Sequence, residues 1–331
     1  MRAQLLYELA PVDRQPLRLE HTDDPVPMAG ELLLDVTACG VCRTDLQEVE
    51  GDIEPHRVPV IPGHQIVGAV AAVGDAVEGW SVGERAGVGW IGGSCGRCNF
   101  CRSGRENLCT SAVFTGWDRD GGYAEKATAD AGYAFHLPEG VSDVDVAPLL
   151  CGGVIGYRAL KVSGIQPGGR LGLYGFGASA LLSLQVALHW GCSVYVATRS
   201  EGERARATEM GAVWVGGYDE PPPMSLDAAV TFAPVGSVVV QALKAVDRGG
   251  AVAINAIHLD EMPAFDYRHL WLERQIRSVA NFTKEDAREF LQLAAEIPIR
   301  TVVQQYRLEE ANRALLDLRE GRVAGAAVLT M

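Results

Sequence analysis

From about residue 170 onward, apolar runs suited to buried strands alternate with helical stretches, and this alternation constrains the fold more than any other feature of the chain. The apolar runs lie at 170–174, 193–198, 226–233, 251–256 and 276–280. Because helical stretches separate the runs, neighbouring strands are predicted to be parallel, with helices on both faces of the sheet. This part of the chain is therefore predicted to be an α/β domain with a doubly wound parallel sheet.

The first 150 residues have a different texture. Short apolar runs, such as 32–36 and 66–73, are broken at close intervals by Gly, Pro and Asp, which predicts a β-rich domain with many loops. After the last strand, the apolar spacing at 285–296 and 309–320 predicts two half-buried helices. A chain of 331 residues with 48% hydrophobic content is long enough for two domains.

A glycine-rich turn follows the first strand of the predicted parallel sheet. The strand at 170–174 leads directly into Gly-Phe-Gly-Ala-Ser-Ala at 175–180, and a helix is expected to follow through about residue 189. The pattern G-x-G-x-x-A is weak evidence by itself, but between a strand and a helix it predicts a dinucleotide site of the Rossmann type. The residues expected to face the pyrophosphate are Gly175, Gly177, Ala178, Ser179 and Ala180.

The end of the second strand bears on the choice of dinucleotide. An Asp or Glu about twenty residues after the turn would bind the adenosine ribose and repel a 2′-phosphate, but Thr198, Arg199 and Ser200 occupy this place. Two hydroxyls and a guanidinium suit a phosphate, so NADP(H) is favoured and NAD(H) is kept as an alternative. The other interpretation of Arg199 is a solvated charge at the end of a strand.

Four cysteines lie close together at Cys95, Cys98, Cys101 and Cys109, in the spacing C-x2-C-x2-C-x7-C. Four thiolates fill all the positions of a tetrahedral zinc ion, so the lobe at 89–110 is predicted to hold a structural zinc. The alternative is a pair of disulfides, which the single, scattered placement of the other cysteines does not favour.

Three further residues are candidate ligands for a second zinc ion. Cys42, His64 and Cys151 lie in separate segments, and two thiolates with one imidazole leave the fourth position of zinc open for water or substrate. Taken singly, each of these residues is more often a buried cysteine or a hydrogen-bonded core histidine.

Six segments of the chain carry a resemblance to a known enzyme family. They are the four-cysteine lobe, the glycine-rich turn, Gly40-Val41-Cys42-Arg43-Thr44-Asp45-Leu46, Pro62-Gly63-His64-Gln65-Ile66-Val67-Gly68, Asp120-Gly121-Gly122-Tyr123-Ala124-Glu125 and Ala147-Pro148-Leu149-Leu150-Cys151. With them, the chain resembles the zinc-dependent alcohol dehydrogenases of the medium-chain dehydrogenase/reductase superfamily over nearly its whole length. The resemblance implies a GroES-like catalytic domain formed by 1–150 and 282–331, with a Rossmann domain inserted at 151–281 and substrate bound between the two.

The same resemblance implies roles for individual residues. It makes Cys42, the cysteine directly before the Arg-Thr-Asp run, a zinc ligand together with His64 and Cys151. Asp45 then orients the ligating histidine, Thr44 moves the substrate proton, and Arg43 contacts the cofactor pyrophosphate. Zinc is expected to act as a Lewis acid while hydride moves between the substrate and the nicotinamide.

Some positions depart from the family pattern or leave alternatives open. Gln65 replaces a glutamate beside the zinc histidine, which predicts a more electrophilic metal site. Gln47 replaces a histidine that passes the proton to water in many members, and glutamine does not titrate. Cys39 is expected to pack in the core. Trp90 and Trp117 are assigned to the substrate pocket, with core packing as the alternative for both.

Charge and hydropathy limit the partners of this chain. With 29 basic and 42 acidic residues its net charge is −13, and the basic residues form no stripe, which argues against nucleic acid. No apolar stretch approaches the ~18 residues that cross a bilayer. We therefore expect a cytoplasmic enzyme acting on a small alcohol, aldehyde or ketone, and the resemblance implies a homodimer or homotetramer. The competing hypotheses are a conjugate-double-bond reductase of the same superfamily and a non-catalytic dinucleotide-binding protein.

Overall fold

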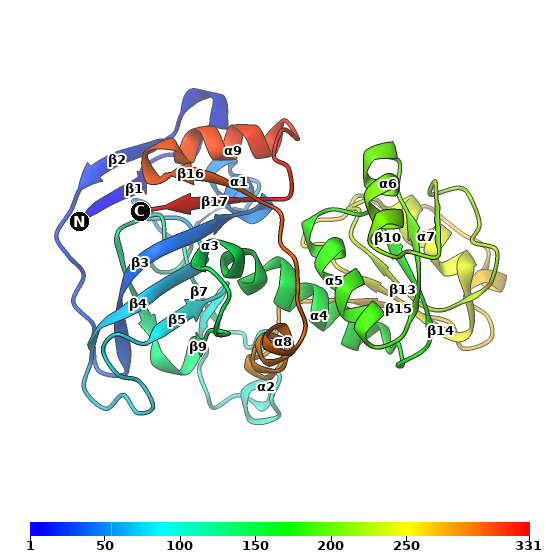
Figure 1. The fold of residues 1–331 in the computed structure, drawn as a ribbon, viewed down its shortest axis with the longest axis horizontal. Coiled ribbons are helices and arrows are strands. Elements are labelled where there is room, and N and C mark those ends of the chain that lie inside the picture. The colour runs from blue at the N-terminus through cyan, green and yellow to red at the C-terminus, as the bar shows by residue number, and fades with distance from the viewer. Residues whose placement is uncertain (54) are drawn as a thin grey trace. The chain divides into compact units, whose positions relative to one another are not determined.

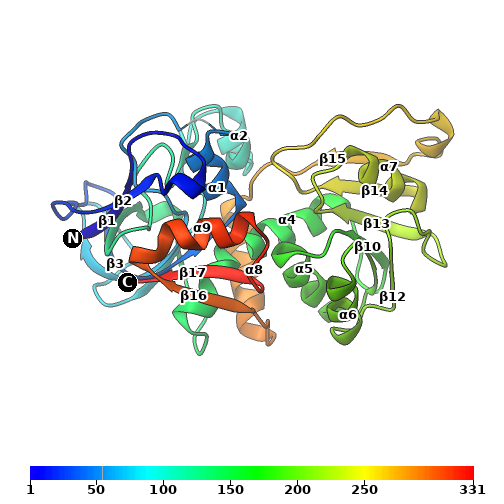
Figure 2. The same ribbon diagram turned by 90° about the horizontal axis from the view of Figure 1, so that it is seen from above.

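The structure is a computed structural model that describes residues 1–53 and 55–331. The described chain divides into two compact units, which Figures 1 and 2 show as ribbons. The first unit comprises Met1–Cys151 and Thr283–Met331, and the second comprises Gly152–Phe282. Both ends of the chain therefore belong to the first unit, and one continuous segment forms the second.

A seven-stranded sheet forms the centre of the first unit. Six strands follow the order β16-β17-β3-β4-β5-β9, and β8 also pairs with β3. The strands are β3 Glu31–Val41, β4 Gln65–Val73, β5 Arg85–Val88, β8 Lys126–Asp130, β9 Ala134–His136, β16 Val303–Arg307 and β17 Ala326–Thr330. Because β17 pairs antiparallel with β3, with Leu329 opposite Cys39, the C-terminal tail completes the sheet that the N-terminal half begins (Figure 1).

Shorter elements surround this sheet. Two antiparallel pairs are formed by β1 Arg2–Leu6 with β2 Leu17–His21 and by β6 Ile91–Gly93 with β7 Val113–Phe114. The helices are α1 Arg43–Glu50, α2 Asn99–Arg102, α3 Asp143–Val146, α8 Lys284–Glu296 and α9 Ala311–Arg319. Short 3-10 turns lie at Val12–Arg14, Glu106–Leu108, Ala131–Tyr133, Ala147–Leu150 and Leu308–Glu310. Helix α8 confirms the prediction at 285–296, whereas α9 starts at Ala311 because the turn before it has 3-10 geometry.

The core of the first unit joins the sheet to its helices. Buried side chains from β1, β3, β4, α1 and α9 form one apolar cluster, which includes Leu6, Leu34, Ile66, Leu46 and Leu315. Since burial of such side chains is the main stabilising term in folding, α1 is held firmly against this sheet. The first turn of α1 carries several of the predicted site residues, so the core fixes their position.

A six-stranded parallel sheet forms the centre of the second unit, in the order β12-β11-β10-β13-β14-β15. The strands are β10 Arg170–Tyr174, β11 Ser193–Ala197, β12 Trp214–Gly216, β13 Leu226–Thr231, β14 Val246–Ile254 and β15 Gln275–Ser278. The helices are α4 Gly152–Ser163, α5 Ala178–His189, α6 Glu201–Glu209 and α7 Gly236–Ala245, with a 3-10 turn at Tyr267–His269. This arrangement confirms the predicted doubly wound parallel sheet.

Two details of the second unit differ from the prediction. Strand β12 Trp214–Gly216 was not expected, because three residues are too few to show a periodic pattern. Strand β14 begins at Val246 rather than at 251, and its pairing with β13 shifts register between Val246 and Ala251, where Gly249 adopts a φ of +74°. Among all the described residues, no helix combines the length and apolarity that crossing a bilayer requires.

Candidate metal and dinucleotide sites

The junction between β3 and α1 positions three of the predicted site residues. Cys42 is the N-cap of α1, and its Sγ accepts a hydrogen bond from the backbone N–H of Thr44 at 3.3 Å. In return, Asp45 Oδ2 accepts from the backbone N–H of Cys42 at 2.7 Å. This reciprocal capping fixes the Cys42 side chain at the start of the helix. Arg43, the first residue of the helix, is exposed, and Thr44 is buried.

His64 lies directly before β4 and is almost fully buried. Its Nδ1 donates to Asp45 Oδ1 at 2.9 Å, so Nε2 is the nitrogen that is left for a metal. Gly63 adopts a φ of +97°, and a Cβ atom there would lie 2.3 Å from the Tyr123 ring, so only glycine fits before the histidine. Gln65 follows as the first residue of β4, and its side chain lies against Gly40.

Cys151 completes a cluster of three ligand side chains. His64 Nε2 lies 3.4 Å from both Cys42 Sγ and Cys151 Sγ, and all three atoms fall within 4.8 Å of one another. A tetrahedral zinc ion with bonds of about 2.3 Å to sulfur and about 2.1 Å to nitrogen separates such ligands by roughly 3.6 Å. The cluster therefore fits a zinc ion, and among the described residues it contains three ligands, which is one fewer than a closed site needs.

The pKa values of the two thiols in this cluster shift in opposite directions. The hydrogen bond from the Cys151 thiol lowers the pKa of Cys42 well below its usual value, and the same bond raises the pKa of Cys151. Cys39, by contrast, is fully buried inside β3 and is outside the cluster. Burial raises the pKa of Cys39, which makes it a poor metal ligand. The expectation that Cys39 packs in the core is confirmed.

The four cysteines of the lobe also converge. Sγ–Sγ distances are 3.9 Å for Cys95–Cys101, 3.4 Å for Cys98–Cys101 and 3.5 Å for Cys95–Cys109. These distances exceed the roughly 2.05 Å of a disulfide and suit four sulfurs around one zinc. Hydrogen bonds from the backbone N–H groups of Arg97 and Cys98 lower the pKa of Cys95 to about 6, which favours the thiolate that binds metal.

Aromatic rings lie beside the three-residue cluster. The Trp90 ring meets His64 edge-on at a centroid distance of 5.0 Å, and it stacks on Phe114 at 5.2 Å and on Trp117 at 5.8 Å. Trp117 in turn stacks on His56 at 4.5 Å, and His56 Nδ1 hydrogen-bonds to Asp118. Trp90 is buried and Trp117 is half-buried. We name this group of Trp90, Phe114 and Trp117 the aromatic wall.

The glycine-rich turn in the second unit has the geometry of an anion site. Gly175 adopts a φ of +93°, and a Cβ atom there would lie 2.9 Å from the backbone nitrogen of Ala233. Gly177 caps α5 without a side-chain hydrogen bond to the helix, and a Cβ atom at Gly177 would meet no atom within 4 Å. The first N–H groups of α5, at Ala178, Ser179 and Ala180, can therefore be approached closely by a phosphate.

Two of the three residues predicted at the end of β11 already hydrogen-bond within the protein. Thr198 is buried, and its hydroxyl donates to the Glu203 carboxylate. The Ser200 hydroxyl accepts from the backbone N–H of Glu203 at 3.3 Å and so caps α6. Arg199 is the cationic residue of the three, and its side chain is exposed. The role of Glu203 was missed because its carboxylate reaches this place through the first turn of α6.

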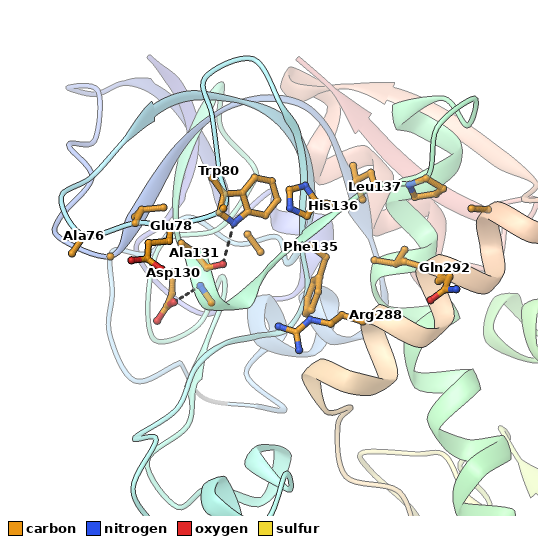
Figure 3. A pocket seen from close by; sticks show the side chains of 18 residues that line it. Ala76, Glu78, Trp80, Asp130, Ala131, Phe135, His136, Leu137, Arg288 and Gln292 are labelled. Atoms are coloured by element: carbon orange, nitrogen blue, oxygen red, sulfur yellow. Dashed lines mark hydrogen bonds between the residues drawn. The ribbon is translucent and has the colours of Figure 1, made fainter.

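A cavity of about 790 Å³ lies elsewhere in the first unit (Figure 3). Trp80 and His136 stack there at a centroid distance of 3.9 Å, Trp80 Nε1 donates to the carbonyl of Ala131 at 3.3 Å, and Arg288 and Gln292 reach it from α8. None of the residues predicted to bind metal, cofactor or substrate lines this cavity. This cavity is therefore separate from the candidate metal and dinucleotide sites.

Comparisons with known proteins agree with this geometry. The alcohol dehydrogenase GroES-like domain matches residues 28–139. The chain is 51% identical to "Probable alcohol dehydrogenase AdhA" of Mycobacterium tuberculosis, over 99% of this chain and 97% of the relative. It is 33% identical to an alcohol dehydrogenase of Geobacillus stearothermophilus, over 100% of this chain and 99% of the relative.

A solved structure shows the same fold over the whole chain. The acetophenone reductase of Geotrichum candidum, in complex with NAD, matches with a TM-score of 0.87 and 25% identity, over 100% of this chain and 97% of the other. This match supports the predicted GroES-like domain with an inserted Rossmann domain. The chain belongs to the zinc-dependent alcohol dehydrogenase family of the medium-chain dehydrogenase/reductase superfamily.

Proposed function

We propose that this protein oxidises small alcohols and reduces the corresponding aldehydes and ketones, with hydride exchanged with NADP(H). The observation that carries the proposal is the convergence of Cys42 Sγ, His64 Nε2 and Cys151 Sγ within 4.8 Å of one another. In this proposal the first unit, Met1–Cys151 and Thr283–Met331, holds the metal through all three residues. The second unit, Gly152–Phe282, binds the dinucleotide.

Two zinc ions per chain are proposed, one at Cys42, His64 and Cys151 and one in the four-cysteine lobe. When bound at the three-ligand site, zinc supplies Lewis acidity toward an alcohol or carbonyl oxygen. Asp45 keeps the proton of His64 on Nδ1 through the 2.9 Å hydrogen bond, which orients Nε2 toward the metal position. The lobe zinc has no open position and is proposed to be structural.

Thr44 is proposed to move the substrate proton. Its hydroxyl both donates and accepts hydrogen bonds, and its backbone N–H is fixed to Cys42 Sγ at 3.3 Å. This backbone hydrogen bond keeps Thr44 next to Cys42, one of the proposed zinc ligands. Gln65 is buried beside His64 and carries no charge. It therefore adds no negative charge near the metal position, which favours an electrophilic metal.

The second unit is proposed to bind the cofactor through the glycine-rich turn at 175–180 and the end of β11, and the contact of Arg43 with the pyrophosphate stays a prediction. Arg199 is the residue proposed to favour NADP(H), because an exposed guanidinium pairs well with a 2′-phosphate. The nearby Glu203 carboxylate opposes a 2′-phosphate. The preference is therefore proposed to be modest, with NAD(H) also accepted.

The aromatic wall is proposed to select the substrate. Trp90 lies edge-on to His64, and its stacking with Phe114 and Trp117 holds a rigid aromatic surface beside this ligand. Planar aromatic or allylic substrates gain favourable ring contacts with such a surface. Branched aliphatic substrates of similar size are proposed to react more slowly.

A homodimer, or a tetramer built from it, is proposed to form through the second unit. β15 is the edge strand of the parallel sheet and offers unpaired backbone groups. Tyr267, Trp271 and Leu272, which precede it, are exposed apolar residues of the kind enriched at protein interfaces. Sedimentation or mass photometry tests this proposal.

The two competing hypotheses do not explain the three-ligand metal site and Thr44. A conjugate-double-bond reductase uses neither a three-ligand metal site nor Thr44 beside it, and a non-catalytic protein needs no open metal position. The discriminating experiment measures zinc content together with activity on aliphatic, benzylic and allylic aldehydes, using NADPH and NADH in parallel. Two zinc ions per chain and carbonyl reduction support the proposal. One zinc ion, or reduction of the conjugated double bond alone, contradicts it.

A further inference from the structure

A buried carboxyl group with no protein partner lies one helical turn from Asp45. Glu48 on α1 is 1% exposed, and among the described residues neither of its two carboxyl oxygens has a hydrogen-bond partner. Residues three apart lie on the same face of a helix, so Glu48 and Asp45 share the face of α1 that carries the bond to His64. A buried polar group without a partner is costly and calls for an explanation.

A second buried group without a partner among the described residues is the hydroxyl of Tyr123, whose ring contacts Gly63, the residue before His64. The Tyr123 ring packs against Gly63, and the backbone N–H of Tyr123 donates to the carbonyl of Pro62 at 3.0 Å. Tyr123 is fully buried, and within the described part of the chain its hydroxyl has no hydrogen-bond partner. Two buried polar groups thus lie next to residues that surround His64: Glu48 shares a helix face with Asp45, and Tyr123 contacts Gly63.

The charges around Glu48 favour its neutral form. Burial raises the pKa of Glu48 well above its usual value, and the negative charges of Asp45, Cys42 and Asp118 raise it further while His64 opposes them. Burial likewise raises the pKa of Tyr123, with Asp45 and Glu48 among the charges that add to it. The two groups are close enough to interact electrostatically. In its protonated form each group can donate as well as accept hydrogen bonds.

We propose that one internal water bridges the Glu48 carboxyl group and the Tyr123 hydroxyl, and that this hydrogen-bonded layer positions Asp45 and His64 behind the metal site. A buried water needs two to four polar partners, and two carboxyl oxygens with one hydroxyl supply them. Glu48 is thus a positioning residue that adds hydrogen bonds without adding charge.

The test compares three substitutions in the full-length, zinc-loaded protein. Glu48→Gln keeps a neutral hydrogen-bonding group, Glu48→Met removes it at similar size, and Tyr123→Phe removes the hydroxyl. We measure the rate of zinc release to a chelator and the thermal unfolding midpoint. The release rate from the four-cysteine lobe serves as an internal reference, because the lobe lies outside this layer.

Loss of outer-layer hydrogen bonds lowers metal affinity by roughly 10–100-fold in comparable sites. Glu48→Met and Tyr123→Phe are each expected to speed zinc release from the three-ligand site about tenfold, with the lobe unchanged. The double variant should be little worse than either single variant, because the shared water is already lost. Glu48→Gln should release zinc within about twofold of the wild-type rate, as expected when one neutral hydrogen-bonding group replaces another.

A matched control separates a shared water from general destabilisation. Thr231 in the second unit also has a buried hydroxyl without a partner among the described residues, and Thr231→Val combined with Glu48→Met should show additive effects on the unfolding midpoint. Additive effects of Glu48→Met and Tyr123→Phe would overturn the proposal. So would Glu48→Gln releasing zinc as fast as Glu48→Met, since that would mean a charged carboxylate is needed.

The inference rests on the proposed function only for the zinc readout. The coupling between Glu48 and Tyr123 in the unfolding midpoint does not require a metal or a substrate. If the protein lacks alcohol dehydrogenase activity but the two substitutions are coupled, the proposed function fails and the water layer stands. If the protein is active and the two substitutions are independent, the proposed function stands and the water layer fails.

Discussion

Replacing Asp45 by Asn isolates the hydrogen bonds that hold the proposed zinc ligands. Asp45 is fully buried, and its two carboxyl oxygens each accept one hydrogen bond, Oδ1 from His64 Nδ1 at 2.9 Å and Oδ2 from the Cys42 N–H at 2.7 Å. Asparagine has the same shape but a single acceptor oxygen. Whichever way the amide turns, its NH₂ group faces one of the two donors.

The expected loss of zinc affinity follows from the number of hydrogen-bond acceptors. One buried donor is left without an acceptor, which costs about 1–3 kcal/mol. If the amide oxygen faces Cys42, the proton on His64 Nδ1 loses its carboxylate, and the ring is free to change tautomer. A cost of about 1.4–2.7 kcal/mol corresponds to a 10–100-fold loss of metal affinity, which is the range measured for such partners.

The assay is competition for zinc between the protein and a chelator of known affinity, with zinc counted per chain. Asp45→Asn should lose one of two zinc ions at a chelator concentration that leaves the wild type loaded. Asp286→Asn is the matched control, because Asp286 is also fully buried and caps a helix through Thr283, but it lies in no metal cluster of the described residues. Equal zinc retention by wild type and Asp45→Asn would refute the reasoning.

Three further predictions concern ligand removal, cofactor choice and pH. Cys151→Ser should abolish alcohol oxidation, because it removes one of the three zinc ligands. Dinucleotide binding, measured by fluorescence titration, should stay within about twofold of the wild type, and unchanged turnover would refute the ligand assignment. Arg199→Ala should raise the KM for NADPH about tenfold and hardly change the KM for NADH, and equal changes would remove the basis for the NADP(H) preference. Burial raises the pKa of Glu48 in the folded state, so the folded protein keeps a proton that the unfolded chain releases above about pH 4.3, and stability falls as pH rises. Glu48→Gln should therefore raise the melting temperature more at pH 8 than at pH 5, and a gain independent of pH would contradict this account.

The parallel sheet and the four-cysteine cluster could be predicted from the sequence because their signals are local. The strand at Arg170–Tyr174 and the helix Ala178–His189 flank a turn in which Gly175 has a steric reason to be glycine. The spacing of the lobe cysteines likewise describes one small loop. By contrast, the set of Cys42, His64 and Cys151 was chosen through a family resemblance, since nothing local joins three separate segments.

What the sequence did not reveal depends on side chains that meet through the fold. Glu203 hydrogen-bonds to Thr198 only because α6 turns back over the strand end, so the hydroxyl assigned to a phosphate already has a partner. Glu48 has the pattern of an ordinary solvated helix residue, yet it is buried with Asp45 on one face. The contact of Tyr123 with Gly63 depends on two loops distant in sequence.

Anomalous X-ray diffraction at the zinc edge, from crystals of the protein as purified, tests the central claim most directly. The account predicts two peaks per chain, one among the four sulfurs of the lobe and one within bonding distance of Cys42 Sγ, His64 Nε2 and Cys151 Sγ. A single peak in the lobe, with these three side chains free of metal in zinc-replete protein, would contradict it.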